Sequence, residues 1–154
     1  MNLTASTDTK TQLRNHALAQ LTDTLNDILK QLGELREASD GEEKNPAGDK
    51  YESGRESIHQ SQTLLDKQYA SLTQMQRQLK EVPVQPVATV QDGALLRLPI
   101  GNIWVSVPVG KVEFDGDVYQ LVSKDSPLVE ALWGMKAGDS VDFRGRKVTL
   151  QEVK

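Results

Sequence analysis

The first half of the chain carries a heptad pattern of hydrophobic positions. Leucines and one isoleucine recur at alternating spacings of three and four residues, at Leu18, Leu21, Leu25, Ile28, Leu32 and Leu35. Such spacing places these side chains along one side of an α-helix, as in the seam of a coiled coil. No proline interrupts residues 10–38. The pattern therefore predicts one helix of roughly 25 to 28 residues, about 40 Å long at about 1.5 Å per residue.

A second heptad pattern follows, with a hydrophobic residue at every seventh position. Its members are Ile58, Leu65, Leu72 and Leu79, with Tyr69 and Met75 between them. We expect this helix to run from about Ala47 or Gly48 to Lys80, because Pro83 and Pro86 follow and proline cannot continue a helix. Ser61 and Gln62 weaken the hydrophobic seam near the start of the helix.

The two predicted helices should pack against each other as an antiparallel hairpin. They have similar lengths, and the break between them is rich in Gly, Pro, Asn and Asp, which favour turns. The alternative is that each helix pairs with the same helix of a second copy. The matched lengths and the short polar break favour the hairpin within one chain.

After residues 83–88, which we interpret as a linker, the pattern changes from heptads to short alternating runs. These predict strands at 94–98, 103–107, 111–114, 118–122, 140–143 and 147–150. Asp115-Gly116 is a strong hairpin signal, and a second hairpin should turn at 144–146. Ser126, Pro127 and Gly134 have the residue types of an N-cap, a first helical position and a helix end, so they predict one short helix between the hairpins.

The predicted fold class is α+β. An antiparallel coiled-coil hairpin over residues 1–82 precedes a small, mostly antiparallel sheet domain with one short helix over residues 89–154. A domain of about 70 residues is near the lower limit for an independent hydrophobic core.

Composition excludes several classes of protein. The chain has 154 residues and no cysteine, so disulfides and thiolate metal sites are excluded. No apolar run approaches the roughly 20 residues of a membrane span, and residues 1–8 do not resemble a secretory signal. A net charge of -4 argues against binding DNA through its phosphates. We expect a soluble, cytoplasmic protein with no sequence-specific DNA binding and no membrane partner.

The negative charge is concentrated at one place, the acidic tip near residues 40–52. Between Glu34 and Glu52 there are seven acidic and three basic residues, an excess equal to the net charge of the whole chain. Carboxylates at a turn are usually solvated, but a pair of them can also complete a magnesium site that is built mainly by another macromolecule. Asp49 and Glu52 are three residues apart, which places both on one face at the start of the second helix. Arg55 follows at the same spacing and could guide a phosphate or form a salt bridge.

The remaining candidates have ordinary structural explanations. His16 and His59 have no partner at metal-binding spacing, so we expect both at the surface. The aromatic residues of the second half are more typical of a hydrophobic core than of an aromatic binding site; they are Trp104, Phe114, Tyr119, Trp133 and Phe143. There is no glycine-rich phosphate loop, nucleophile elbow or zinc pattern. Nothing in the sequence indicates an enzyme that works alone or a cofactor of its own.

Two motifs resemble those of bacterial Gre-type (GreA/GreB) transcript cleavage factors. Gly48-Asp49-Lys50-Tyr51-Glu52 is similar to the tip motif of that family, a Gly-Asp pair followed by two variable residues and Glu. Residues 126–139, which read SPLVEALWGMKAGD, resemble its second signature, a helix led by Ser-Pro and followed by a Gly-Asp turn. The resemblance covers nearly the whole chain.

The resemblance implies a C-terminal domain of FKBP-like fold that docks on RNA polymerase at the rim of the secondary channel. The hairpin would then enter the channel and bring Asp49 and Glu52 to the active centre of a backtracked complex. There these two acids would stabilise the second Mg²⁺ of the polymerase and position the attacking water. The protein would reach the 3′ end of the nascent RNA only indirectly. The resemblance also implies partner-binding roles, which fall on Ser126, Pro127, Leu128, Gly134 and Arg55.

Departures from the family motif leave a second interpretation open. Glu52 is followed by Ser53-Gly54-Arg55-Glu56, where the family usually has Asn and then a small-acidic-Tyr run. The preceding segment 40–46 adds other acids, Glu42 and Glu43 among them. The alternative is a Gre-like regulator or inhibitor that binds in the channel without stimulating cleavage. A third, weaker interpretation is a stand-alone prolyl isomerase of FKBP-like fold.

Overall fold

A computed structural model of the protein describes residues 3–43 and 50–154, with side chains described for 8–38 and 56–154. These residues form two compact units. One unit joins Met1–Ala19 to Arg77–Lys154, and the other comprises Gln20–Gln76. Long helices are followed by a mostly antiparallel sheet with a short helix, so the predicted α+β class is confirmed.

The first helix is longer than its hydrophobic pattern predicted. Helix α1 spans Leu3–Glu43, 41 residues, and therefore includes the acidic segment 40–43 in its helical backbone. A hydrophobic seam marks where a helix packs, whereas helical backbone extends beyond it because adding a residue is far easier than starting a helix. A glycine such as Gly41 costs a helix only about 1 kcal/mol relative to alanine, too little to end it. Helix α2 spans Lys50–Glu81, close to the prediction.

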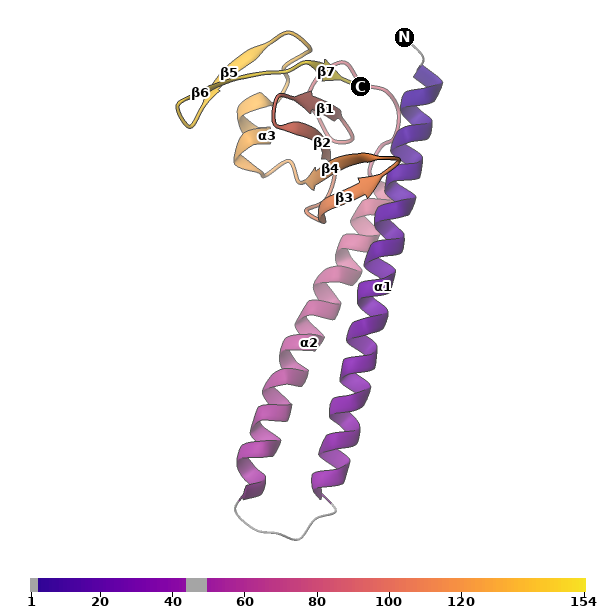
Figure 1. Cartoon of the computed structure of the whole chain (residues 1–154), viewed down its shortest axis with the longest axis vertical. Helices are drawn as coiled ribbons and strands as arrows, with labels where there is room; N and C mark the ends of the chain where they lie inside the picture. Colours follow the sequence, from indigo (N-terminus) through magenta and orange to yellow (C-terminus); the bar gives the residue numbers. More distant parts are fainter. Residues whose placement is uncertain (1–2, 44–49) are drawn as a thin grey trace. The chain divides into compact units, whose positions relative to one another are not determined.

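The second half forms two sheets and a short helix (Figure 1). The five-stranded sheet has the order β3-β4-β2-β1-β7, and the two-stranded sheet pairs β5 with β6. The elements are β1 (Leu95–Leu98), β2 (Gly101–Val105), β3 (Gly110–Phe114), β4 (Asp117–Val122), α3 (Pro127–Leu132), β5 (Ser140–Phe143), β6 (Arg146–Thr149) and β7 (Glu152–Val153). Both predicted hairpins are confirmed, with turns at 115–116 and 144–145.

One strand pairing was not predicted. Strands β2 and β4 run parallel, in register from Asn102 opposite Tyr119 to Val105 opposite Val122. Strand β3 lies outside this pair at the sheet edge, where it pairs antiparallel with β4. Hairpin signals specify neighbours along the chain, so they carry no information about a pairing that skips a strand.

The five-stranded sheet buries side chains on both faces. One face packs with α3 in a core of Val90, Ala94, Leu96, Leu98, Ile103, Val105, Val129, Leu132, Leu150 and Val153. On the other face, the strand registers place Leu95, Trp104 and Leu121 side by side. Trp104 is completely buried, and its indole Nε1–H donates to the carbonyl oxygen of Gly93 at 3.1 Å.

The aromatic residues only partly follow the predicted core. Trp104 and Tyr119 are buried, whereas Phe114 and Phe143 are half-buried. The prediction was wrong for Trp133, whose side chain is 46% exposed. Helix α3 ends at Leu132, and Trp133 already has extended backbone, so its side chain does not continue the helix face on which Val129 and Leu132 are buried.

The first part of α1, up to Ala19, and the last part of α2, from Arg77, belong to the same unit as the sheets. We call these two parts the helix bases. Leu13 and Ala17 of α1 and Leu79 of α2 have no exposed surface. His16 lies at the surface, as predicted, but its ring also contacts that of Phe114 in β3 in a tilted arrangement, with 5.9 Å between ring centroids and 53° between the ring planes. The Nζ of Lys10 donates to the carbonyl oxygen of Gln85 at 2.9 Å, which ties α1 to the segment that follows α2.

Lys10 is the one charged residue among the described side chains that is fully buried. No described carboxylate forms an ion pair with it, and burial lowers the pKa of its amine from 10.5 to about 8. Between about pH 8 and 10.5 the unfolded chain therefore holds more protons at this site than the folded protein does. Under that condition, folding stability rises with pH.

We expect Lys10→Met to stabilise the protein at pH 7 by about 1 kcal/mol or more, because a methionine fills the site without burying a charge. It should also remove the rise in stability between about pH 8 and 10.5. Urea unfolding at several pH values measures both effects. Lys30→Met at an exposed position of α1 is the control and should keep the rise. A Lys10→Met variant with an unchanged pH dependence would contradict the assigned pKa.

The segment 83–88 belongs to the same unit as the sheets, and its Pro83 lies against Gly93. Gly93 has φ of +86°, and a Cβ at this position would collide with the carbonyl oxygen of Pro83. We expect Gly93→Ala to lower the free energy of unfolding by on the order of 2 kcal/mol, since strain and collision add. Gly101 is the control, because it also has positive φ, at +133°, but no atom lies within 4 Å of its Cβ position. In urea unfolding, Gly101→Ala should lower the free energy of unfolding less than Gly93→Ala does. Equal losses would show that the contact with Pro83 is unimportant.

Candidate functional site: the helical hairpin and the α3 face

The residues predicted to act at the acidic tip are only partly described. Asp49 lies outside the described residues, and Glu52 and Arg55 are described as helical backbone of α2. The magnesium role therefore stays a prediction. Within the residues that the structure describes, no group of three or more His, Asp or Glu side chains could hold a metal ion.

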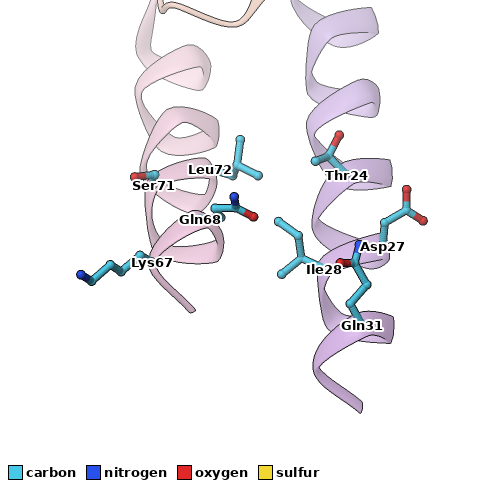
Figure 2. A pocket seen from close by; sticks show the side chains of 8 residues that line it. All are labelled: Thr24, Asp27, Ile28, Gln31, Lys67, Gln68, Ser71 and Leu72. Carbon is cyan, nitrogen blue, oxygen red and sulfur yellow. The ribbon is translucent and has the colours of Figure 1, made fainter. Parts of the chain in front are cut away.

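The unit of residues 20–76 is a helical hairpin within one chain, as predicted. The amide Nε2 of Gln76 in α2 donates to the Oγ1 of Thr22 in α1 at 3.0 Å. Side chains of both helices also line a hollow of about 600 Å³ between them (Figure 2). Figure 2 shows Ile28 of α1 and Gln68 and Leu72 of α2 pointing into this space.

Packing of the hydrophobic seam weakens along the hairpin toward the acidic segment. In α1, Leu21, Leu25 and Ile28 are buried, whereas Leu32 and Leu35 are half-buried. The seam of α2 contributes Ser61 and Gln68 between its hydrophobic residues, and these polar side chains cannot fill the space between the helices. A second hollow of about 410 Å³ lies there, lined by Gln31, Glu34, Leu35, Ser61, Leu64 and Leu65.

Four of the predicted docking residues lie in or beside α3; they are Ser126, Pro127, Leu128 and Gly134. Ser126 occupies the N-cap position, and its carbonyl oxygen accepts the backbone N–H of Glu130 at 2.9 Å. Its hydroxyl makes no capping hydrogen bond. Pro127 is the first helical residue and is exposed, whereas Leu128 is half-buried against the core. Only part of the Ser-Pro-Leu segment is therefore available to a partner.

The second part of the motif, residues 134–139, is held by hydrogen bonds of its backbone. The N–H of Gly134 donates to the carbonyl of Val90 at 2.9 Å, and the N–H of Val90 donates to Met135 at 2.8 Å. The carboxylate of Asp139 accepts the N–H of Lys136 at 3.0 Å and closes the next turn. Gly134 and Asp139 thus have structural roles that explain their place in the motif.

The sequence did not reveal one exposed feature of this face. Trp133 lines a hollow of about 300 Å³ together with Lys124, Asp125 and Glu130. A signal was present, because Gly134 predicted the helix end and therefore a change of direction at its neighbour. The structure does not bring Glu52 or Arg55 into the same compact unit as α3.

Comparison with known proteins gives a likeness in structure alone. No protein-family model matches the sequence, and no curated protein matches it either.

None of the helices in the described ranges has the length and hydrophobicity needed to cross a membrane.

Three solved structures align with most of the chain. The GreA factor homolog 1 (Gfh1) protein of Thermus thermophilus is 18% identical over 89% of this chain and 94% of that chain, with a TM-score of 0.36. A structure of the transcription factor Gfh1 is 19% identical over 90% and 93%, with a TM-score of 0.35. Thermus aquaticus Gfh1 is 18% identical over 90% and 94%, with a TM-score of 0.36. These proteins are Gre-factor homologues, the group that the two motifs resemble, but at these values the likeness carries no information about activity.

Because leucines of the hairpin differ in burial, we expect their replacement by alanine to destabilise the protein to different degrees. Leu25 is 7% exposed, whereas Leu64 is 57% exposed. We expect Leu25→Ala to lower the free energy of unfolding by about 2–4 kcal/mol and Leu64→Ala by less than about 1 kcal/mol. Urea unfolding followed by circular dichroism measures both. Equal losses would mean that the hairpin packs as closely at Leu64 as at Leu25.

Proposed function

We propose that this protein is an accessory transcription elongation factor that stimulates RNA polymerase to cleave backtracked nascent RNA. The observation that carries the proposal is the concentration of acidic residues over 34–52, where the sequence passes from one long helix to the next, in two helices that pair within one chain. A helical hairpin can bring such a segment into a narrow channel that a globular surface cannot enter. The channel proposed here is the secondary channel of the polymerase.

The chemistry proposed for the acidic tip is assistance to a metal ion. Helix α2 begins at Lys50, so Glu52 lies in its first turn and Asp49 directly precedes it in the sequence. The positive end of the helix dipole favours negative charge at this position. Mg²⁺ takes one or two carboxylates and fills its remaining positions with water and phosphate oxygens. Asp49 and Glu52 would help to hold the second Mg²⁺ of the polymerase and would position the attacking water, and the metal would supply Lewis-acid activation of that water.

The α3 face is the proposed docking surface for RNA polymerase. It presents the exposed Pro127 at the start of the helix and Trp133 at its end. Ser126, Leu128 and Gly134 hold these positions through the backbone bonds and core contacts described above. The protein would supply no cofactor and perform no reaction alone, and it would act in the cytoplasm, where the polymerase works.

A second candidate function is regulation of the polymerase without cleavage. Arg55 lies three residues after Glu52 in the helical backbone of α2, a spacing that puts two positions on one face of a helix. A guanidinium at this spacing can pair with the carboxylate and compete with a metal ion for it. The protein would then occupy the channel and inhibit or modulate the polymerase.

Neutralising the two acids tests the cleavage function. We expect Asp49→Asn combined with Glu52→Gln to abolish stimulated cleavage of a stalled, backtracked complex in the presence of Mg²⁺, because amides are poor magnesium ligands. Binding to the polymerase should be unchanged. The measurement is the release of short 3′ RNA fragments, resolved by gel. Glu56→Gln, one turn further along α2, is the matched control and should cleave like the wild type.

The outcomes separate the two candidates. A wild-type protein that binds the polymerase, competes with an authentic cleavage factor and releases no fragments is a regulator. A double variant that cleaves like the wild type would assign the role to other acids, with Glu42 and Glu43 the next to test.

A further inference from the structure

The α3 face exposes a tryptophan where the chain leaves the helix. Trp133 is 46% exposed, whereas the other tryptophan, Trp104, is completely buried. An exposed indole in a small domain leaves a large apolar surface in water. Tryptophan is also among the residues that contribute most to protein interfaces.

The surroundings of Trp133 are charged rather than apolar. The hollow of about 300 Å³ beside it is lined by Lys124, Asp125 and Glu130. Both acidic residues have a fixed backbone, because the N–H of Asp125 donates to the side-chain Oγ of Ser123 at 3.2 Å and Glu130 belongs to α3. The N–H of Trp133 donates to the carbonyl of Glu130 at 3.4 Å, which fixes the spacing of these two residues.

The two carboxylates have no ion-pair partner among the described side chains. Lys124 lines the same hollow but pairs with neither of them within 4.0 Å. An apolar side chain in this space would remove water from the carboxylates without replacing their hydrogen bonds, and an anion would be repelled by them. A cation interacts favourably with both the carboxylates and Trp133, since it pairs with carboxylates and is attracted to the face of an indole.

We propose that the hollow between Trp133, Asp125 and Glu130 receives an arginine side chain of a protein partner. Identifying that partner as RNA polymerase rests on the function proposed above. Arginine fits better than lysine, because its planar guanidinium can stack on the indole while its N–H groups bind carboxylates in a fork. Lys124 offsets one of the two negative charges in the lining, so one added cation neutralises the hollow and a second is disfavoured.

The chemistry of the hollow is tested without the polymerase. The full-length protein is labelled with 5-fluorotryptophan, which gives one ¹⁹F resonance for each of its two tryptophans. N-acetyl-argininamide is then added up to about 50 mM, a range suited to millimolar affinity. We expect the Trp133 resonance to shift and the buried Trp104 resonance to stay in place.

N-acetyl-citrullinamide is the matched probe, because citrulline has the shape of arginine without its charge. It should cause little shift, and Asp125→Asn combined with Glu130→Gln should remove the response to arginine. Equal shifts with both compounds, or no shift with either, would overturn the proposed recognition of arginine.

Binding to RNA polymerase tests the partner. We expect Trp133→Ala to weaken binding by roughly ten- to thirty-fold and Trp133→Phe to weaken it less, because phenylalanine keeps an aromatic face. Asp125→Asn combined with Glu130→Gln should weaken binding and reduce its dependence on salt. Ile100→Ala is the control, since Ile100 is 73% exposed in the same unit and does not line the hollow.

The two experiments separate failure of the inference from failure of the proposed function. If the wild type binds the polymerase and Trp133→Ala binds equally well, the hollow is not the docking site and the proposed function stands. If the wild type does not bind the polymerase, the proposed function fails, and the titration with the arginine compound still decides what the hollow recognises.

Discussion

The burial of the helix bases in the sheet unit is the constraint on which the rest of the structure depends. Leu13 and Ala17 of α1 and Leu79 of α2 are completely buried there, about 60 residues apart in the sequence. These contacts join segments of the chain that no local pattern brings together. Within the unit of residues 20–76, the hydrogen bond between Gln76 and Thr22 pairs the two helices even though their seam contains polar side chains.

The sequence predicted those parts of the fold that are determined by neighbouring residues. Heptads predicted both helices, and the Asp115-Gly116 turn predicted its hairpin because few residue pairs adopt that backbone. The parallel pairing of β2 with β4 depends on packing between distant segments, so no local pattern indicated it. The extent of α1 was underestimated because hydrophobic spacing reports contact with a partner, whereas helical backbone continues without one.

The candidate site was predictable to the same degree. Charge is a property of residue type, so the acidic tip was evident from the sequence. The exposure of a side chain also depends on where its helix ends, and Trp133 is exposed just after α3 ends at Leu132. The structure also divides the second motif into residues that hold the backbone, such as Gly134 and Asp139, and residues that remain free to contact a partner. A motif recognised from sequence does not separate these two roles.

The shared core of the sheet unit has a consequence for synthesis of the chain on the ribosome. Leu95 exchanges backbone hydrogen bonds with Lys154, at 3.1 and 3.0 Å, so strand β1 is complete only after residue 154 has emerged. Met1–Ala19 belongs to the same compact unit as β7, so the earliest residues of this unit wait for some of the latest. Contacts between segments so far apart in the sequence close large loops, which makes the folding of this unit slow.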